Sequence, residues 1–309
     1  MSRIHPMLLL TVAGAIVAPT ELLQAQNNRL AEASTPAPRY TAAATVRYGD
    51  AVRLGNGHAR AYIVVEEKTG APRELGVAFD ASALEGLPAG GSGHHGNGGD
   101  GAPPPMTHEY ILSLPAGNKT PFTFVEMNWN PMGHEPEGVY QDVPHFDFHF
   151  YTISKVARDS IVPTNPEFEK KGGNLPPAEF VPPFNVALGP PGVEPAKLVV
   201  PMMGLHWVDL RSAELQKLLG KPEGYKPFTA TFIYGSWDGR FHFWEPMVTR
   251  AFILSKKEAT DPAVRDQLIP ISTPAKYQTA GYYPAAYRVA WDATAREYRI
   301  ALTELALRK

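Results

Sequence analysis

The segment His145-Phe146-Asp147-Phe148-His149-Phe150 constrains the fold more than any other part of the chain. Successive side chains of a β-strand point to opposite faces, so the three phenylalanines fall on one face. Two imidazoles and a carboxylate fall on the other. A strand with three phenylalanines on one side is well buried on that side. The row of His145, Asp147 and His149 on the other side indicates that it lines a polar pocket and does not simply face solvent.

The composition supports a β protein of ordinary globular character. Of the 309 residues, 44% are hydrophobic and 19% are charged, so a sizeable core is available. The 31 prolines and 27 glycines are poorly tolerated inside long helices or central strands. We therefore predict a mainly β, antiparallel sandwich or barrel with a few short helices and long Pro/Gly-rich loops. Residues 41–309 are predicted to form a single domain.

Turn dipeptides locate the predicted hairpins. Asn56-Gly57 and Asp238-Gly239 each lie between β-type runs, which predicts hairpins at 44–67 and 228–246. The second hairpin is expected to extend into 252–255. A strand is expected at 197–201 and a short helix at 212–219. Residues 88–105 form a Gly-rich loop that is flexible by composition.

The N-terminus has the features of a targeting segment. Arg3 and His5 precede an apolar run at 7–18, which has the length of a signal-peptide core and is too short to span a bilayer comfortably. Cleavage after Ala25 would remove residues 1–25 as a signal peptide and leave 26–40 as a disordered lead-in. The alternative is a retained anchor. We expect a periplasmic or secreted protein with no membrane span after cleavage.

Charge and cysteine content limit the partners and the metal chemistry. The net charge is −2 and there is no Lys/Arg patch, so nucleic acid is not expected as a partner. The chain has no cysteine, which excludes thiolate sites. Any metal must be held by imidazole and carboxylate groups, which suits zinc, iron, manganese or copper.

The histidine strand cannot form a complete site alone. Residues two apart on a strand are about 6.6 Å apart, whereas His145 and His149 are roughly 13 Å apart. Either two of the three polar groups bind the metal while the third orients a ligand or acts as a base, or the strand curves enough for all three. Asp147 could instead fix an imidazole tautomer.

Further donors are expected from other segments. His134 lies across a turn from the strand, His206 follows a buried-looking run, and Glu245 shares a face with Phe241 and Phe243 in the second hairpin. We predict one site with the metal ligands His134, His145, His149 and His206, and with Asp147 and Glu245 as catalytic carboxylates. The alternatives are a structural hydrogen-bonding row, a buried salt bridge at Glu245 and a hydrogen-bonded core position for His206.

Other candidate residues favour ordinary roles. His94 and His95 are expected to be solvated, as loop residues, and the histidines at 58, 108 and 242 to be solvated or packed. Trp207, Trp237 and Trp244 could line a sugar or aromatic pocket, but core packing is the preferred interpretation. The chain has no G-x-S-x-G elbow, Walker loop or His-Glu-x-x-His helix.

Three stretches carry a resemblance to a known family. They are 76–88, which ends in Leu-Glu-Gly-Leu-Pro; 128–151, which runs from Asn-Trp-Asn-Pro-Met-Gly-His through the histidine strand; and 206–247, with His-Trp-Val-Asp and Tyr-Gly-Ser-Trp-Asp-Gly. Together they resemble the uncharacterised family typified by the sigma-E-controlled protein of Thermus thermophilus. The resemblance implies an exported or envelope-associated, mostly β protein that forms a homo-oligomer, and it implies no catalytic residues.

Three functions are compatible with these features. The first is an exported metal-binding protein that acts as a metal-dependent enzyme, a hydrolase or an oxidoreductase. The second is a non-catalytic envelope stress or assembly protein with a structural histidine cluster. The third is a carbohydrate-binding module with a saccharide or other small-molecule ligand.

Overall fold

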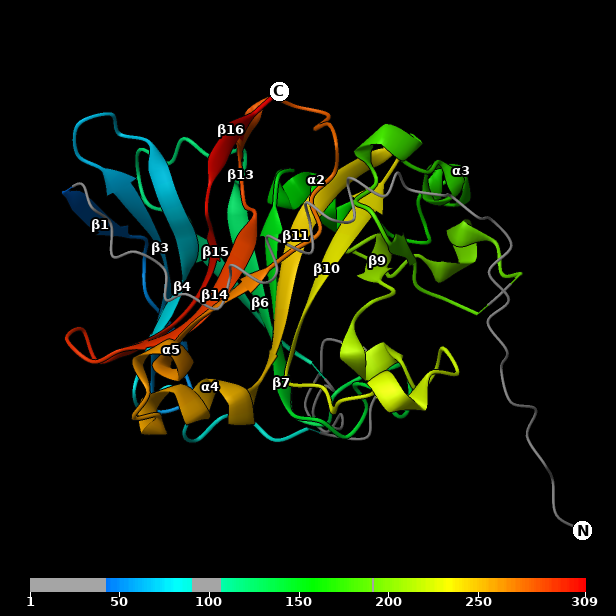
Figure 1. Ribbon diagram of the computed structural model, residues 1–309. Helices are drawn as coiled ribbons and strands as arrows, with labels where there is room; N and C mark the ends of the chain where they lie inside the picture. The colour runs from blue at the N-terminus through cyan, green and yellow to red at the C-terminus, as the bar shows by residue number, and fades with distance from the viewer. Residues whose placement is uncertain (1–42, 91–106, 191) are drawn as a thin grey trace, which may run out of the picture.

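Two open antiparallel sheets face each other in the computed structural model, which describes residues 43–90, 107–190 and 192–309 (Figure 1). The chain is therefore mainly β, as predicted, and the sandwich alternative applies because neither sheet closes into a barrel. The signal-peptide and lead-in predictions, His94, His95 and most of the Gly-rich loop lie outside the described residues.

The first sheet is built from both ends of the described chain, and we call it the terminal sheet. Its central order is β1, β3, β4, β15, β14 and β12, with β2 paired to β3. Its strands are β1 (Ala44–Tyr48), β2 (Val52–Leu54), β3 (Gly57–Glu66), β4 (Pro72–Asp80), β12 (Asp266–Pro270), β14 (Ala286–Asp292) and β15 (Glu297–Thr303).

The second sheet carries the histidine strand, and we call it the histidine sheet. Its order is β5, β6, β7, β11, β10, β9 and β8. Its strands are β5 (His108–Ser113), β6 (Phe124–Asn130), β7 (His145–Tyr151), β8 (Asn185–Ala187), β9 (Leu205–Asp209), β10 (Ala230–Trp237) and β11 (Arg240–Thr249). A separate pair joins β13 (Gly281–Tyr283) to β16 (Ala306–Arg308).

Aromatic side chains fill the space between the two sheets. Phe146, Phe148 and Phe150 of β7 are fully buried there. The Phe79 ring of β4 lies 6.0 Å from the Phe146 ring and 6.1 Å from the Phe148 ring, so the two sheets touch directly. Each buried phenylalanine contributes about 1.5–3 kcal/mol relative to an exposed one. This energy fixes which face of β7 points inward and thereby turns His145, Asp147 and His149 outward.

The long connections cover the outer face of the histidine sheet. Residues of the 131–144, 152–204 and 210–229 segments pack on it, among them Tyr140, Leu215 and Phe228, which are buried with Met247 of β11. Short helices lie in or after these segments: α2 (Lys155–Asp159), α3 (Phe168–Gly173), η1 (Ala178–Phe180), η2 (Pro195–Leu198), η3 (Ala213–Leu215) and η4 (Pro222–Gly224). The outer polar row is therefore an interior site.

Several local expectations are corrected by the structure. Residues 252–255 do not extend the hairpin but lie in α4 (Arg250–Glu258), because the Thr249 hydroxyl accepts from the Phe252 N–H and caps a helix. The strand expected at 197–201 is replaced by η2, which begins at Pro195. The helix expected at 212–219 is reduced to η3. The 228–246 hairpin is confirmed as β10–β11.

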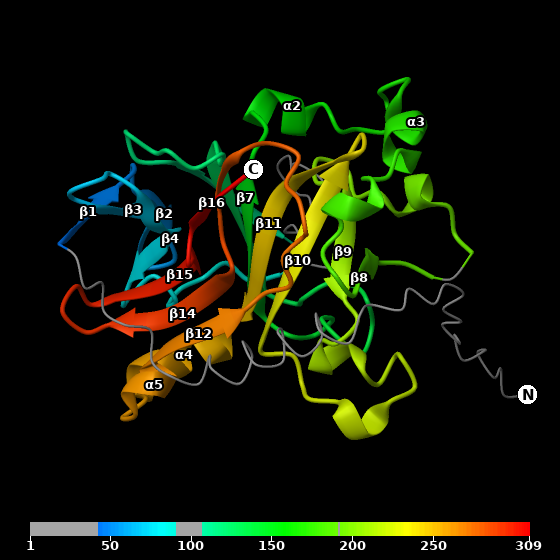
Figure 2. The same ribbon diagram turned by 45° about the horizontal axis from the view of Figure 1, so that its top comes forward.

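Helices α4 and α5 (Pro262–Arg265) lie together beside β12 and β14, at one end of the sandwich (Figure 2). None of the helices in the described part of the chain has the length and apolar character needed to cross a membrane.

Candidate metal site

Strand β7 presents the predicted alternation. It pairs with β6 on one side and β11 on the other, so it is a central strand held in regular register. The phenylalanines enter the inter-sheet core, whereas His145, Asp147 and His149 point to the covered outer face. The prediction that these three share one side of a strand is confirmed.

The first group of candidate ligands consists of His134, His145 and Asp147. The His134 Nε2 lies 3.3 Å from Asp147 Oδ2, and the His145 Nε2 lies 3.2 Å from Asp147 Oδ1. Gly133, with φ of +65°, turns the chain so that His134 reaches back to β7. A side chain at Gly133 would place Cβ 2.0 Å from the Tyr140 carbonyl oxygen, so only glycine fits this turn.

Backbone carbonyls set the tautomers of both imidazoles in this group. The His134 Nδ1 is 2.7 Å from the Glu135 oxygen, and the His145 Nδ1 is 2.6 Å from the Val143 oxygen. A carbonyl only accepts, so each Nδ1 carries the hydrogen and donates it. A neutral ring then has a lone pair on Nε2, and in both rings that lone pair faces an oxygen of the Asp147 carboxylate.

The second group consists of His149, His206 and Glu245 from three different strands. The His149 Nε2 is 3.4 Å from Glu245 Oε1, and the His206 Nε2 is 3.9 Å from Glu245 Oε2. His206 of β9 is opposite Gly235 of β10, which is opposite Phe243 of β11. A Cβ at Gly235 would lie 1.8 Å from the Phe243 ring, so this glycine lets the Phe243 ring lie across β10 beside both imidazoles.

Burial determines the protonation of the second group. It lowers the pKa of His149 to about 3 and that of His206 to about 4, and it raises the pKa of Glu245 well above its usual value, an effect that Asp147 reinforces. Both nitrogens of His149 and one oxygen of Glu245 are buried without a hydrogen-bond partner among the described residues. Each such atom costs about 1–3 kcal/mol.

The first group has the opposite electrostatic character. Burial alone would raise the pKa of Asp147, but His145 and His134 bring it well below its usual value. Burial would lower the pKa of His134, but the Asp147 carboxylate raises it. The side chain of His134 is 36% exposed whereas that of His145 is fully buried, so solvent reaches this group from the His134 side.

The six predicted residues thus come together, but in two groups. The four histidines predicted for a single site are divided between the two groups: His134 joins His145, and His206 joins His149. The reason is the length of β7, because positions 145 and 149 are roughly 13 Å apart along a strand and cannot share an ion. Each group nevertheless contains two imidazoles and one carboxylate, whose ligand atoms lie within 4.8 Å of one another.

A second polar row on β6 was missed from the sequence. Glu126, Asn128 and Asn130 are opposite His149, Asp147 and His145, respectively. The Asn130 side chain donates to Asp147 Oδ2 at 2.7 Å and holds the carboxylate in place. The signal was present, since Val125, Met127 and Trp129 alternate with these three residues and enter the core.

An ion-pair network adjoins the second group. Arg158, which is 2% exposed, contacts the carboxylates of Glu126 and Glu109. Burial raises the pKa of Glu126 to about 7, although Arg158 opposes this shift. The network supplies a fixed cation beside the buried acid and was not predicted.

The other histidines take no part in the two groups. The rings of His58 and His108 make contacts at the surface, to the Asp80 carboxylate and the Ala89 carbonyl, in line with the expectation that they are solvated. His242 is buried and its Nε2 is 2.6 Å from the Met203 oxygen, which is a packing role. Trp207 donates to the Ser236 hydroxyl at 2.8 Å and is also a packed residue.

The fold and the site together define a β-sandwich with two histidine–carboxylate groups that could each hold a metal ion. A family model described as TTHB210-like, hypothetical protein TTHB210, matches residues 68–129. This match confirms the resemblance noted from the sequence and covers β4, β5 and nearly all of β6. It ends before His134, so it includes none of the six site residues. No curated protein and no solved structure matches the chain.

Proposed function

We propose that the protein binds divalent transition metal ions, one at each histidine–carboxylate group, and uses them as a metal-dependent hydrolase or oxidoreductase. His134, His145 and Asp147 would hold one ion, and His149, His206 and Glu245 the other. Zinc, iron, manganese and copper all accept this donor set.

The observation that carries the proposal is the convergence of two imidazole nitrogens on one carboxylate in the first group. The Nδ1 atoms of His134 and His145 donate to backbone carbonyls, so their Nε2 atoms face the Asp147 oxygens, at 3.3 and 3.2 Å, and in neutral rings they would present lone pairs to that carboxylate. Such a contact is repulsive unless a cation lies between the atoms. Asp147 raises the pKa of His134, so a proton serves for that ring, whereas one metal ion would serve for both rings and the carboxylate at once.

The spacing of the donors also suits a metal. Two ligands each about 2.1 Å from a tetrahedral zinc ion are about 3.4 Å apart. The four nitrogen–oxygen distances in the two groups run from 3.2 to 3.9 Å. A metal in the second group would also pair the His149 Nε2 and the Glu245 Oε2, which otherwise have no hydrogen-bond partner among the described residues.

The number of donors favours catalysis over a purely structural role. Structural zinc sites close with four protein ligands, whereas two histidines and one carboxylate leave positions open for water or substrate. Each group has three donors among the described residues. A bound metal with open positions supplies either an activated water or a centre for oxygen chemistry.

Metal analysis of the full chain, purified without a histidine tag, tests the proposal. We expect close to two equivalents of transition metal, falling by one in His145→Ala and by one in His149→Ala. The matched control is His58→Ala, which removes an exposed histidine outside both groups. Protein that holds no metal after incubation with zinc, iron(II), manganese or copper(II) would refute the proposal.

A further inference from the structure

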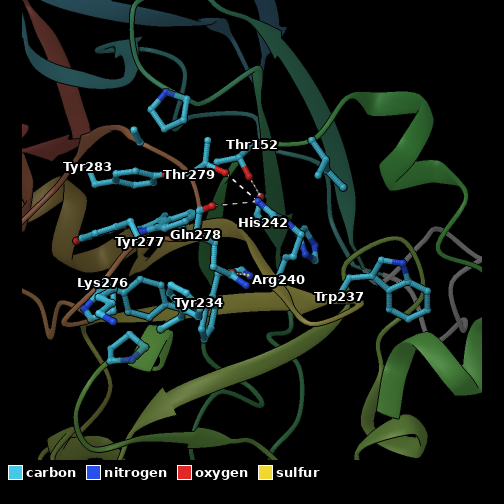
Figure 3. A pocket seen from close by; sticks show the side chains of 18 of the residues that line it. Thr152, Tyr234, Trp237, Arg240, His242, Lys276, Tyr277, Gln278, Thr279 and Tyr283 are labelled. Carbon is cyan, nitrogen blue, oxygen red and sulfur yellow. Dashed lines mark hydrogen bonds between the residues drawn. The ribbon is translucent and has the colours of Figure 1, made fainter. Parts of the chain in front are cut away.

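A concave region lies outside both histidine groups, and none of their six residues lines it. It is a pocket of about 430 Å³ between the β10–β11 hairpin and the 274–283 segment (Figure 3). Trp244 and Tyr234, which line it, belong to the inter-sheet core rather than to the outer face. The pocket is therefore separate from both histidine groups, and its volume is that of a small-molecule site.

The walls of this pocket are aromatic and mutually packed. The ring centroids of Tyr277 and Tyr283 lie 4.2 Å apart, and those of Trp244 and Tyr283 lie 5.2 Å apart. Tyr234 packs against both Trp244 and Phe241, each at 5.8 Å. Side chains held on several sides in this way form a preformed pocket, and an aromatic lining of this kind suits an apolar, aromatic ligand.

Polar groups in the pocket lining are not balanced in charge. Lys276 has a carboxylate partner in Glu179, at 3.9 Å, and Asp238 accepts from the Asn174 amide. Arg240, in contrast, is exposed and bonds only neutral acceptors: the Thr279 hydroxyl at 2.8 Å and the Gln278 main-chain carbonyl at 3.5 Å. No carboxylate of the described residues lies within ion-pair distance of it. Its guanidinium thus stands beside an aromatic pocket without a counter-charge.

We propose that this pocket binds a small aromatic carboxylate. The ring lies among Trp244, Tyr277 and Tyr283, and the carboxylate pairs with Arg240. A guanidinium recognises a carboxylate through two parallel hydrogen bonds, which a neutral amide does not reproduce. Charge is therefore the feature that separates this ligand class from neutral aromatics and from saccharides.

Calorimetric titration of the full chain with indole-3-acetate, indole-3-acetamide and cellobiose tests the proposal. We expect the acid to bind at least about tenfold more tightly than the amide, since hydrogen bonds between a guanidinium and a carboxylate are roughly twice as strong as those between neutral groups. Cellobiose is expected to give no measurable binding. Arg240→Gln removes the charge and should abolish the preference for the acid while the amide binds as before.

The matched control is Arg53→Gln, an exposed arginine on β2 of the other sheet, which should keep the wild-type preference. Circular dichroism and thermal melting verify that both variants are folded. Equal binding of acid and amide, an unchanged preference in Arg240→Gln, tighter binding of cellobiose, or no binding of the acid at millimolar concentration would each overturn the proposal. None of these outcomes bears on the metal groups, whose metal content is measured separately.

Discussion

Replacing Asp147 with asparagine removes the charge of the first histidine group and almost nothing else. Asparagine has the same shape as aspartate, and its carbonyl oxygen can still accept the 2.7 Å hydrogen bond from Asn130. The two imidazoles remain, but the anionic donor between them is lost. We expect this variant to lose the metal of the first group and to keep that of the second.

The size of the effect follows from linkage between binding and folding. A ligand at 100 times its dissociation constant stabilises the folded state by about 2.7 kcal/mol per site. For a domain of this size, 1 kcal/mol shifts the melting temperature by roughly 2–4 °C. Wild-type protein should therefore melt roughly 5–10 °C higher with each group filled.

Melting curves with zinc and with chelator, recorded for each protein, measure this increment. The melting temperatures with zinc and with chelator are compared within each variant. Any stability that Asp147→Asn loses through its ion pairs in the metal-free state therefore does not enter the increment. Asp147→Asn should show about half of the wild-type increment and one equivalent of metal instead of two.

Asp142→Asn is the matched control. This substitution is the same chemical change, made in the loop that leads to β7. Asp142 is exposed, and asparagine tolerates its φ of +61°. It should keep the full increment. A wild-type increment retained in Asp147→Asn, with unchanged metal content, would refute the assignment of Asp147 as a ligand.

Three further outcomes are expected. Gly235→Ala forces the Phe243 ring away from His149 and His206, so it should lower the free energy of unfolding by about 1–3 kcal/mol and empty the second group only. The control is Gly173→Ala, whose Cβ would meet its nearest atom at 3.9 Å. Full metal content in Gly235→Ala would contradict the proposed role of Gly235. Phe148→Ala should lower the free energy of unfolding by roughly 3–5 kcal/mol in a denaturant titration, and a loss under about 1 kcal/mol would mean that Phe148 is not in the core. In metal-free protein, the ring protons of His149 and His206 should not shift in NMR spectra between pH 7 and 5, because burial lowers the two pKa values to about 3 and 4. Histidine in the unfolded chain takes up a proton near pH 6.5, so these two residues lower the stability of the folded state as the pH falls from 6.5 to 4. Ring protons that shift near pH 6.5 in the folded protein would instead show that the two residues are exposed.

Local sequence patterns determined the histidine strand, its two faces and the β10–β11 hairpin, although they placed strands wrongly at 197–201 and 252–255. The alternation in 145–150 was sufficient to predict β7 and to separate its phenylalanines from its polar groups, because a strand has a period of two whatever its neighbours are. The Asp238-Gly239 turn likewise placed β10 and β11. The same alternation in β6 would have predicted Glu126, Asn128 and Asn130 as the neighbouring polar row.

The division of the candidate ligands between two groups was decided only by the tertiary structure. His206 reaches Glu245 because β9 lies two strands from β11 and the strand between them has a glycine at position 235. His134 reaches Asp147 through a turn whose direction depends on Gly133 and the Tyr140 carbonyl. Strand order and loop path result from packing between segments far apart in the chain, and no local period encodes them. The sequence therefore determined which side chains face the site, and long-range packing determined which of them meet.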